Sequence, residues 1–597
     1  MTVALVLAAE ADAGMCGQLA ALGVRRVDLA GGITGSADYG SGLLTVAAAA
    51  RVAGERVLIC VGPEAIPGDI LARLLSTGRT AAFTGSAPFT GSAATIGSGA
   101  LLIDTTHLTA LADATESLAA APPAGDVLAA LLGELARRGV PVRILDAGAD
   151  GDGAVAQLLA DPVAIRVAKW ALARELAPTS LCGISLGLGL IAAVWFSTPK
   201  ASSMAIGVAA LAAAFVAGRA GSLVAASGRW AEPALDWLGT ASALLIEFSA
   251  YAALALSATR AANSTADTGL GGVFGHALHG TFAATWGGAS ATGVWRLAIA
   301  AMGIVGIRRL TELCYDQAAD GHGLHRPVPR RLEQAVTLPA GERFAVIAIT
   351  VLLFGPRLTF LVLLGLGVIA LAYVLTGRVL GSALTEAVNP GGRPPATAQT
   401  WLPAYRNDGL LAHWIGGVVK GSLPPLLPAV VGLFVASVLA SVGLANMPGI
   451  LVLTPVEVML LAALGASHPH NGRRDWLVPP MLMAGEYVFA AALGLSHQVP
   501  PAVVFALLAA IVLRHVDVGY RARHGRGLSA DTLGLGWDGR MLLLGLAAMV
   551  AEAPLAYFAL AGYLWVLVGW DFLGGWLADT EAEEADEEAA AEEGIDV

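Results

Sequence analysis

The chain has 597 residues, of which 56% are hydrophobic and 14% are charged, and its mean hydropathy is +0.69. Soluble domains usually carry about 25% charged residues. This composition excludes a wholly soluble enzyme or a nucleic-acid-binding protein, and it indicates a protein with several membrane spans. Only three of the 35 basic residues are lysines, and the heavy use of Ala, Gly and Arg is typical of a bacterial genome of high GC content.

The net charge of −11 comes from the C-terminal segment. Residues 579–597 contain ten acids and no base, and the rest of the chain carries 36 acids and 35 bases. Such a run of like charges is typical of a disordered, solubilising tail. The cysteines Cys16, Cys60, Cys182 and Cys314 form no CxxC pair, so they indicate neither a disulfide framework nor a zinc site.

Residues 1–150 predict a soluble α/β domain. Short apolar segments are typical of buried strands, and helical stretches such as 125–138 lie between them. The predicted strands are Val3–Ala8, Arg56–Val61, Gly99–Asp104 and Val140–Leu145. Strands that alternate with helices favour a mostly parallel sheet covered on both faces.

From residue 160 onward the sequence predicts an all-α membrane region. Residues 161–175 form an amphipathic helix that suits the membrane surface. About twelve apolar segments long enough for spans follow, at 181–197, 203–217, 236–258, 292–307, 343–356 and 358–377, and then at 424–444, 449–466, 477–495, 500–513, 540–554 and 556–577. They define two six-helix membrane domains, 160–385 and 400–578, which precede the tail at 579–597.

Arginines predict the orientation in the membrane, because cytoplasmic loops are enriched in positive charge. One side carries nearly all of them, at Arg219, Arg229, Arg308, Arg309, Arg326, Arg330, Arg331, Arg473, Arg474, Arg514, Arg521, Arg523 and Arg526. The other side has little beyond Arg260 and Arg357. We therefore expect a multi-pass protein of the cell membrane with its N-terminal domain and C-terminal tail in the cytoplasm.

A spaced pattern of polar residues and glycines marks the first membrane half. Arg219 is followed by Gly228, Glu232 and Asp236 at intervals of nine, four and four residues. Glu232 and Asp236 share one helix face because they are four residues apart. Acids at a membrane boundary are costly unless they pair, bind a metal or face water.

This pattern resembles the signature of the CDP-alcohol phosphatidyltransferases, D-x2-D-G-x2-A-R-x8-G-x3-D-x3-D. The resemblance covers about 160–385 and includes DPVAIRVAKWALARELAPTSLCGISLGLGLIAAVWF, which looks like the family's amphipathic helix and first span. It implies six spans, a homodimer, and transfer of a phospho-alcohol group from a CDP-alcohol to a hydroxyl acceptor with release of CMP. In that family the acids hold two divalent metals, which stabilise the attacking and leaving oxygens, and the last Asp is the base.

The resemblance assigns a role to each matching position. Asp236 would be the catalytic base, Glu232 and Asp236 would bind Mg²⁺ or Mn²⁺, and Arg219 and Gly228 would contact the substrate. Glu232 substitutes for the third Asp of the signature, and its first three positions also depart from it. Leu211 and Ala214 stand where its first two aspartates should be, and Phe215 replaces its first glycine.

Hard divalent cations need oxygen ligands, which Leu and Ala lack. We therefore expect that this site alone does not catalyse the family reaction. The alternative is a degenerate scaffold in which Asp236 pairs with Arg219 or Arg229.

The N-terminal domain resembles a sugar-nucleotide-type nucleotidyltransferase with similar losses. ALVLAAEADAG, VLICVGPEAIPGDIL and IGSGALLID stand where that family has its glycine-rich loop and two later strands. Glu10 and Ala11 disrupt the loop, Pro63 occupies the position of the metal-binding Asp, and no lysine precedes Lys169. Without cations to neutralise a triphosphate the chemistry lacks its main electrostatic contribution, so we predict an inactive domain. A fusion of these two domain types is known in inositol-phospholipid biosynthesis.

The second membrane half contains a partial copy of the same spacing. Asp517 precedes Gly534 by 17 residues and Asp538 by 21, which are the intervals from the first Asp of the signature to its second glycine and its third Asp. We hypothesise that Asp517 and Asp538 are catalytic and metal-binding residues. The nearby His515, Arg521 and Arg523 would then bind substrate, because arginine suits phosphate.

The pattern in the second half also has explanations that involve no function. The spacing can be a coincidence, since Tyr520, Arg521, His524, Gly525 and Leu542 replace the other signature residues. The arginines can be ordinary positive-inside residues, and His468 and His470 can be surface residues of a loop.

Three functions follow from these patterns. The first is an enzyme of phospholipid biosynthesis that uses a CDP-alcohol and a membrane lipid, with its site in the second half or shared between the halves. The second is an inactive scaffold or regulatory subunit for an active CDP-alcohol phosphatidyltransferase and other enzymes of the process. The third is a transporter, which the small number of ionisable residues near mid-membrane disfavours. Nucleic acid is not an expected partner.

Overall fold

The computed structural model divides the chain into two compact units. The first consists of Met1–Asp152 and Ser222–Ala231, and the second of Gly153–Gly221 and Glu232–Val597. The structure describes residues 2–7, 26–29, 56–61, 81–84, 99–103, 108–111, 113, 143–144, 153, 156–174, 176–225, 235–263, 291–318, 336–388, 402, 405–419, 423–445, 447–466, 472, 474–523 and 534–571.

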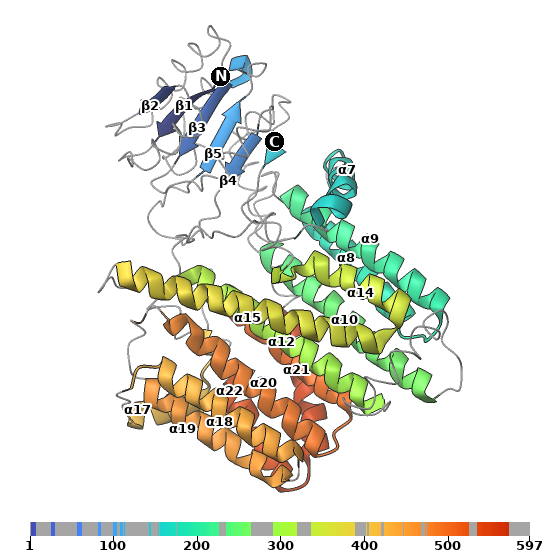
Figure 1. Ribbon diagram of the computed structural model, residues 1–597, viewed down its shortest axis with the longest axis vertical. Coiled ribbons are helices and arrows are strands. Elements are labelled where there is room, and N and C mark those ends of the chain that lie inside the picture. Colours follow the sequence, from blue (N-terminus) through green and yellow to red (C-terminus); the bar gives the residue numbers. More distant parts are fainter. Residues whose placement is uncertain are drawn as a thin grey trace, which may run out of the picture. The chain divides into compact units, whose positions relative to one another are not determined.

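The first unit contains a six-stranded mixed sheet (Figure 1). Its strands are β1 (Thr2–Leu7), β2 (Arg26–Leu29), β3 (Arg56–Val61), β4 (Ala81–Thr84), β5 (Gly99–Ile103) and β6 (Arg143–Ile144). The strand order is β2-β1-β3-β5-β4-β6, and β5 runs antiparallel to both of its neighbours. Strand β3 lies inside the sheet, and its Val57, Leu58 and Ile59 are fully buried. A continuous apolar run of this kind is typical of a strand covered on both faces.

Strands occur at all four of the predicted places, and the prediction missed β2 and β4. The pairs β1–β2, β1–β3 and β4–β6 are parallel, as expected, whereas the two pairs made by β5 are antiparallel. The predicted helix at 125–138 lies outside the described residues. The α/β domain therefore stays a prediction.

The second unit is built from helices. Its first half contains η3 (Ala156–Ala160), α7 (Asp161–Leu172), α8 (Pro178–Phe196), α9 (Ala201–Ala225), α10 (Leu235–Asn263), α12 (Ala291–Ala318), α14 (Ala340–Phe354) and α15 (Pro356–Val388). Its second half contains α17 (Leu410–Val419), α18 (Leu426–Ala445), η4 (Pro448–Val452), α19 (Leu453–Ala466), η5 (Asp475–Leu477), α20 (Val478–Ser496), α21 (Pro501–Arg523), α22 (Gly536–Met549) and a last helix at Ala553–Asp571.

Among the described residues, eight helices are long and apolar enough to cross a membrane. They are α8, α9, α10, α15, α18, α20 with η5, α21 and the helix at Ala553–Asp571. The chain is therefore a membrane protein with several spans. The amphipathic helix predicted at 161–175 corresponds to α7, which exposes Val163, Ile165 and Trp170.

Helices also lie at the other four predicted spans, but they do not meet the same criterion. Helices α14, α19 and α22 have 14 or 15 residues, which gives about 22 Å against a hydrocarbon core of about 30 Å. Helix α12 has 28 residues but includes Arg296, Arg308 and Arg309. Within the described residues, length and composition therefore support eight of the twelve predicted spans.

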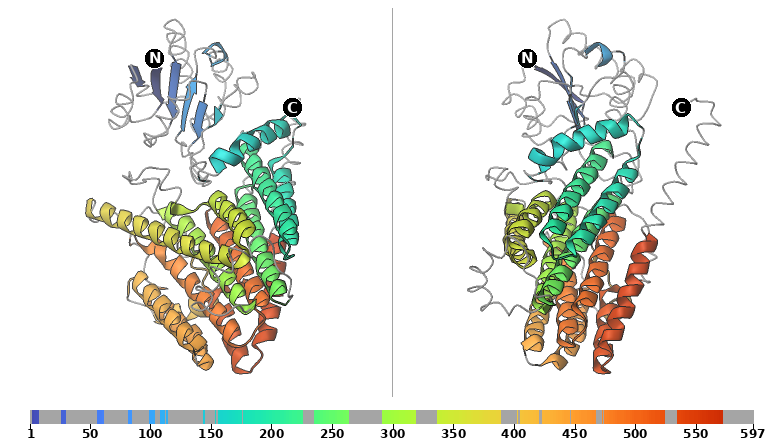
Figure 2. Two further views of the ribbon diagram at one scale, coloured as in Figure 1. Left: turned by 45° about the vertical axis from the view of Figure 1, so that its right-hand side comes forward. Right: turned by 90° about the vertical axis from the view of Figure 1, so that its right-hand side faces the viewer.

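The two predicted membrane halves share one hydrophobic core. Helix α12 packs against α15 in the first half and against α20 and α21 in the second, and α10 also packs against α21 (Figures 1 and 2). The core cluster runs from Ala192 in α8 to Val568 in the last helix. A functional site can therefore lie at the contact between the halves as well as within either half.

A close helix contact in the second half depends on Gly494 near the end of α20. A Cβ atom at this position would lie 2.6 Å from Cγ2 of Val504 and 2.9 Å from Cε1 of Tyr557. Both neighbours belong to other helices, and the tyrosine ring is stiff. Only glycine therefore fits without a shift of α21 or of the helix at Ala553–Asp571.

We expect Gly494→Ala to lower the thermal unfolding midpoint of the full-length protein in detergent, because overpacking costs about 1–3 kcal/mol. Gly485→Ala is the matched control on the same helix, since a Cβ there meets no heavy atom within 4 Å. Equal midpoints for the two variants would contradict this account of the contact.

Candidate functional site

A buried polar network joins three helices of the second half. Arg540 of α22 donates two hydrogen bonds to Glu486 of α20, from Nε to Oε1 at 2.7 Å and from Nη2 to Oε2 at 3.0 Å. Both side chains are almost fully buried. A paired charge of this kind is costly to break, because the remaining partner would be left in an apolar interior.

His515 of α21 completes this network. Nη2 of Arg540 donates to Nε2 of His515 at 3.0 Å, and Nδ1 of His515 lies 2.8 Å from the hydroxyl of Tyr487. Because arginine has no acceptor, Nε2 must accept, and the proton of the neutral ring must lie on Nδ1. His515, predicted to bind substrate, therefore has both ring nitrogens engaged inside the bundle.

Asp538 lies at the N-terminus of α17. Its two carboxylate oxygens accept hydrogen bonds from the backbone amides of Gly409, at 2.7 Å, and Ala412, at 2.8 Å. The first amides of a helix have no partner within the helix, so a carboxylate there acts as a cap. Gly536, with φ of +61°, allows this approach, because a Cβ there would collide with the backbone of Gly409.

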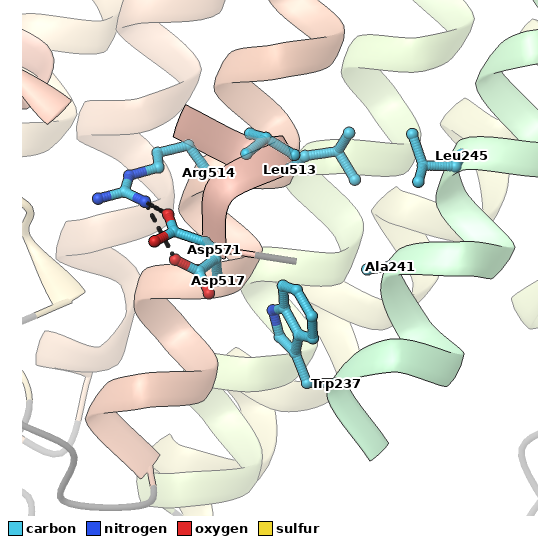
Figure 3. Close-up of a pocket in the computed structure, with 8 residues that line it drawn as sticks. Trp237, Ala241, Leu245, Leu513, Arg514, Asp517 and Asp571 are labelled. Carbon is cyan, nitrogen blue, oxygen red and sulfur yellow. Dashed lines mark hydrogen bonds and ion pairs between the residues drawn. The ribbon is translucent and has the colours of Figure 1, made fainter. Parts of the chain in front are cut away.

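Asp517 belongs to a separate cluster with two arginines and a second acid. Nη1 of Arg514 lies 3.3 Å from Oδ2 of Asp517, and Nε of Arg521 lies 3.0 Å from the same oxygen. Nη2 of Arg521 lies 2.7 Å from Oδ1 of Asp571, which also pairs with Arg514. Each arginine therefore contacts both acids. Figure 3 draws the two contacts of Arg514.

This cluster forms one end of a small pocket between the two halves. Helix α10 contributes Trp237, Ala241 and Leu245, and the other lining residues are Leu513, Arg514, Asp517, Val568 and Asp571 (Figure 3). Tyr520, one turn beyond Asp517, is buried against Trp237. The pocket therefore has a charged end and an apolar wall.

Asp236, the predicted base, directly precedes Trp237 in α10. The spacings in the two halves thus lead to neighbouring places in the structure, which agrees with the prediction of a site shared between the halves. The side chains of Asp236 and Arg523 lie outside the described part of their helices, as do Gly228 and Glu232. Their predicted roles stay predictions.

The signature positions of the first half are filled by packed apolar side chains. Leu211 and Ala214 are buried in the shared core, with exposed fractions of 2% and 0%. The ring of Phe215 meets that of Phe344 edge to face, with 5.5 Å between centroids. These three positions therefore stabilise α9 by packing.

Arg219 has an acidic partner at the beginning of α7. Its Nε donates to Oδ1 of Asp161 at 2.8 Å. The degenerate-scaffold hypothesis expected Asp236 to pair with Arg219 or Arg229, and that pairing stays a prediction because the side chain of Asp236 and all of Arg229 lie outside the described residues. The pair of Arg219 and Asp161 ties α9 to the amphipathic helix.

A second network in the first half was missed by the sequence argument. Arg343 of α14 donates from Nε and Nη2 to the two oxygens of Glu247, at 2.7 and 2.8 Å, and Tyr251 donates to the same carboxylate at 2.6 Å. Glu247 lies in the middle of the predicted span 236–258. Its position was the available signal, because an acid inside a span needs a partner.

Glu312 lies beyond the predicted span of α12 and accepts a hydrogen bond from Arg308 at 2.8 Å. Burial alone would raise the pKa of this carboxyl. The positive charges of Arg308, Arg309 and Arg378 outweigh that effect and lower the pKa of Glu312 below its ordinary value of 4.5.

Two of the four acids predicted to bind Mg²⁺ or Mn²⁺ have described side chains, and both contact protein groups. Asp538 uses both oxygens to cap α17, and Asp517 is paired with Arg514 and Arg521. Among the described residues, no three His, Cys, Asp or Glu side chains gather in a way that could hold a metal ion. Metal binding by Glu232, Asp236, Asp517 and Asp538 stays a prediction.

The comparisons with known proteins concern the second half. Residues 396–592 match a family of unknown function, DUF5941. This match covers about a third of the chain and includes both polar clusters of the second half. No curated protein matches the chain.

We expect Glu486→Gln to destabilise the protein by about 3–5 kcal/mol, because Arg540 would keep its buried charge without a counter-ion. The double variant Glu486→Leu with Arg540→Met should lose less, since it removes both charges. Thermal unfolding in detergent measures the difference. Glu457→Gln on α19 is the control, because its carboxylate accepts no hydrogen bond from the described residues. A double variant less stable than Glu486→Gln would show that the unpaired charge of Arg540 is not the cause of the loss.

Glu312→Gln should reduce stability at neutral pH and have little effect in acid. Because the folded pKa of Glu312 is below 4.5, the ionised carboxylate stabilises the fold above pH 4.5, and this contribution is lost as the pH falls through the folded pKa. Unfolding midpoints of the native protein and the variant over a pH series measure it. A difference in midpoint between the two proteins that stays the same in acid would contradict a lowered pKa of Glu312.

Proposed function

We propose that the chain is a non-catalytic membrane subunit of phospholipid biosynthesis, with a framework similar to that of the CDP-alcohol phosphatidyltransferases. In this role it would scaffold or regulate an active enzyme of that family in the cell membrane. The observation that carries the proposal is the packing of Leu211, Ala214 and Phe215, where the signature has Asp, Asp and Gly.

The side chains at these positions provide neither the oxygen ligands nor the open space that a dinuclear metal site needs. A dinuclear metal site needs oxygen donors around a polar opening, and Leu211 and Ala214 offer neither because they are part of the core. The contact between Phe215 and Phe344 closes the same face of α9. A scaffold needs only the framework, and that is what these substitutions stabilise.

The same reasoning extends to the proposed partners. A homodimer follows from the family resemblance, and an active phosphatidyltransferase with its cytidylyltransferase would complete the assembly. The N-terminal sequence fits this role, because its segments are placed like those of a nucleotidyltransferase but lack the residues that nucleotide chemistry needs. The N-terminal domain and the tail would lie in the cytoplasm, on the side that carries most arginines.

The test is CMP release by the purified full-length protein in bilayer nanodiscs. We expect no metal-dependent release from CDP-diacylglycerol or other CDP-alcohols with Mg²⁺ or Mn²⁺, with or without an acceptor alcohol, above that of empty nanodiscs. An active phosphatidyltransferase added to the chain should co-elute with it, and the rate of CMP release by that enzyme should change when the chain is present. Release by the chain alone would overturn the proposal.

A second candidate function is transfer of a phospho-alcohol group at the pocket shared by the halves. One observation favours it, namely that Trp237, next to Asp236, lines the same pocket as Asp517. Two acids from different halves would then provide the base and a charge near the substrate.

The same assay separates the two candidates. If the shared pocket is catalytic, Asp236→Ala and Asp517→Ala should each abolish CMP release. Asp161→Asn, a change of an acid outside the pocket, should retain it. Release that survives both alanine variants would exclude the pocket as the catalytic site.

A further inference from the structure

The charged cluster at the pocket consists of Arg514, Asp517, Arg521 and Asp571. We propose that Arg514 and Arg521 bind the phosphate group of a phosphate ester with an apolar part, and that Asp571 occupies this place when no ester is bound. The proposal concerns binding, and it holds whether or not the chain transfers a group.

The two arginines are arranged for a single anion. They lie seven residues apart on α21, so they share one face of the helix, and both reach Asp571 from there. Arg521 points Nη2 at one carboxylate oxygen of Asp571, and Arg514 points Nη1 at the other. A phosphate offers oxygens to both guanidinium groups in the same way and carries more charge.

Asp571, rather than Asp517, is the acid that can leave. Asp517 lies three and four residues from the arginines on the same helix and stays near them whatever else moves. Asp571 comes from another helix, at Ala553–Asp571. It can therefore move away from the arginines without any change in α21.

The pocket explains why the ligand should be an ester with an apolar part. Beyond the charged end, the wall of the pocket consists of Trp237, Ala241, Leu245, Leu513 and Val568. An apolar wall next to two arginines fits an amphiphile. Arg521 is 20% exposed and Asp571 is 14% exposed, which leaves the charged end accessible.

Calorimetric titration of the full-length protein in detergent tests the proposal. The probes are dioctanoyl phosphatidic acid, dioctanoylglycerol, which lacks the phosphate, and inorganic phosphate, which lacks the apolar part. The variants are Asp571→Asn, Arg521→Gln and Arg521→Lys. Asp161→Asn and Arg260→Gln are matched controls, because both residues lie away from the pocket.

We expect Asp571→Asn to bind dioctanoyl phosphatidic acid about tenfold more tightly, and Arg521→Gln to bind it about tenfold more weakly, as the gain or loss of one charge-assisted hydrogen bond implies. The controls should stay within about twofold. Arg521→Lys should lie between the native protein and Arg521→Gln. Dioctanoylglycerol should not bind.

Other results would overturn the proposal in separable ways. Inorganic phosphate binding as tightly as the lipid would show that the site takes the free ion and that the apolar wall is irrelevant. An unchanged dissociation constant in Asp571→Asn would show that Asp571 does not compete with the ligand. Absence of binding to both the native protein and Asp571→Asn would remove the site altogether, and this holds even if Arg521→Gln fails to fold.

Discussion

The ion pair between Arg540 and Glu486 is the interaction on which the second membrane half depends. Both charges are almost fully buried, so each is tolerated only because the other is present. The same guanidinium donates to the backbone oxygen of Gly534 and to His515. One side chain thus fixes the beginning of α22 against α20 and α21, and the position of Asp538 in the same turn follows from it.

The polar groups of the chain serve two different purposes. In the first half Leu211 and Ala214 belong to the core, and described charges such as Glu247 and Arg343 are paired between helices. At the contact between the halves, by contrast, charged groups line a pocket that Trp237 helps to close. Charged side chains thus join helices in the first half and line a cavity at the contact, which is why we place the proposed binding site at the contact.

The positions of helices were predictable because apolar runs of this length have few other uses. Four of the strands were predictable for a similar reason, whereas β2 and β4 have only four residues each and carry little periodicity. The cluster around Asp517 was predicted in part, since Arg521 was named and Asp571 and Trp237 were not. Those two come from distant parts of the chain, and only tertiary packing brings them together. The cap made by Asp538 could not be predicted either, because a carboxylate at a helix start normally serves its own helix.

That cap has a consequence for the order in which the protein is made. The amide of Ala412 and the carboxylate of Asp538 are separated by 126 residues, so α17 leaves the ribosome long before its cap exists. Until α22 has been synthesised and inserted, the first amides of α17 must find water or a temporary acceptor. Helix α17 is therefore expected to reach its final place late in biogenesis, after the helices that follow it in the sequence.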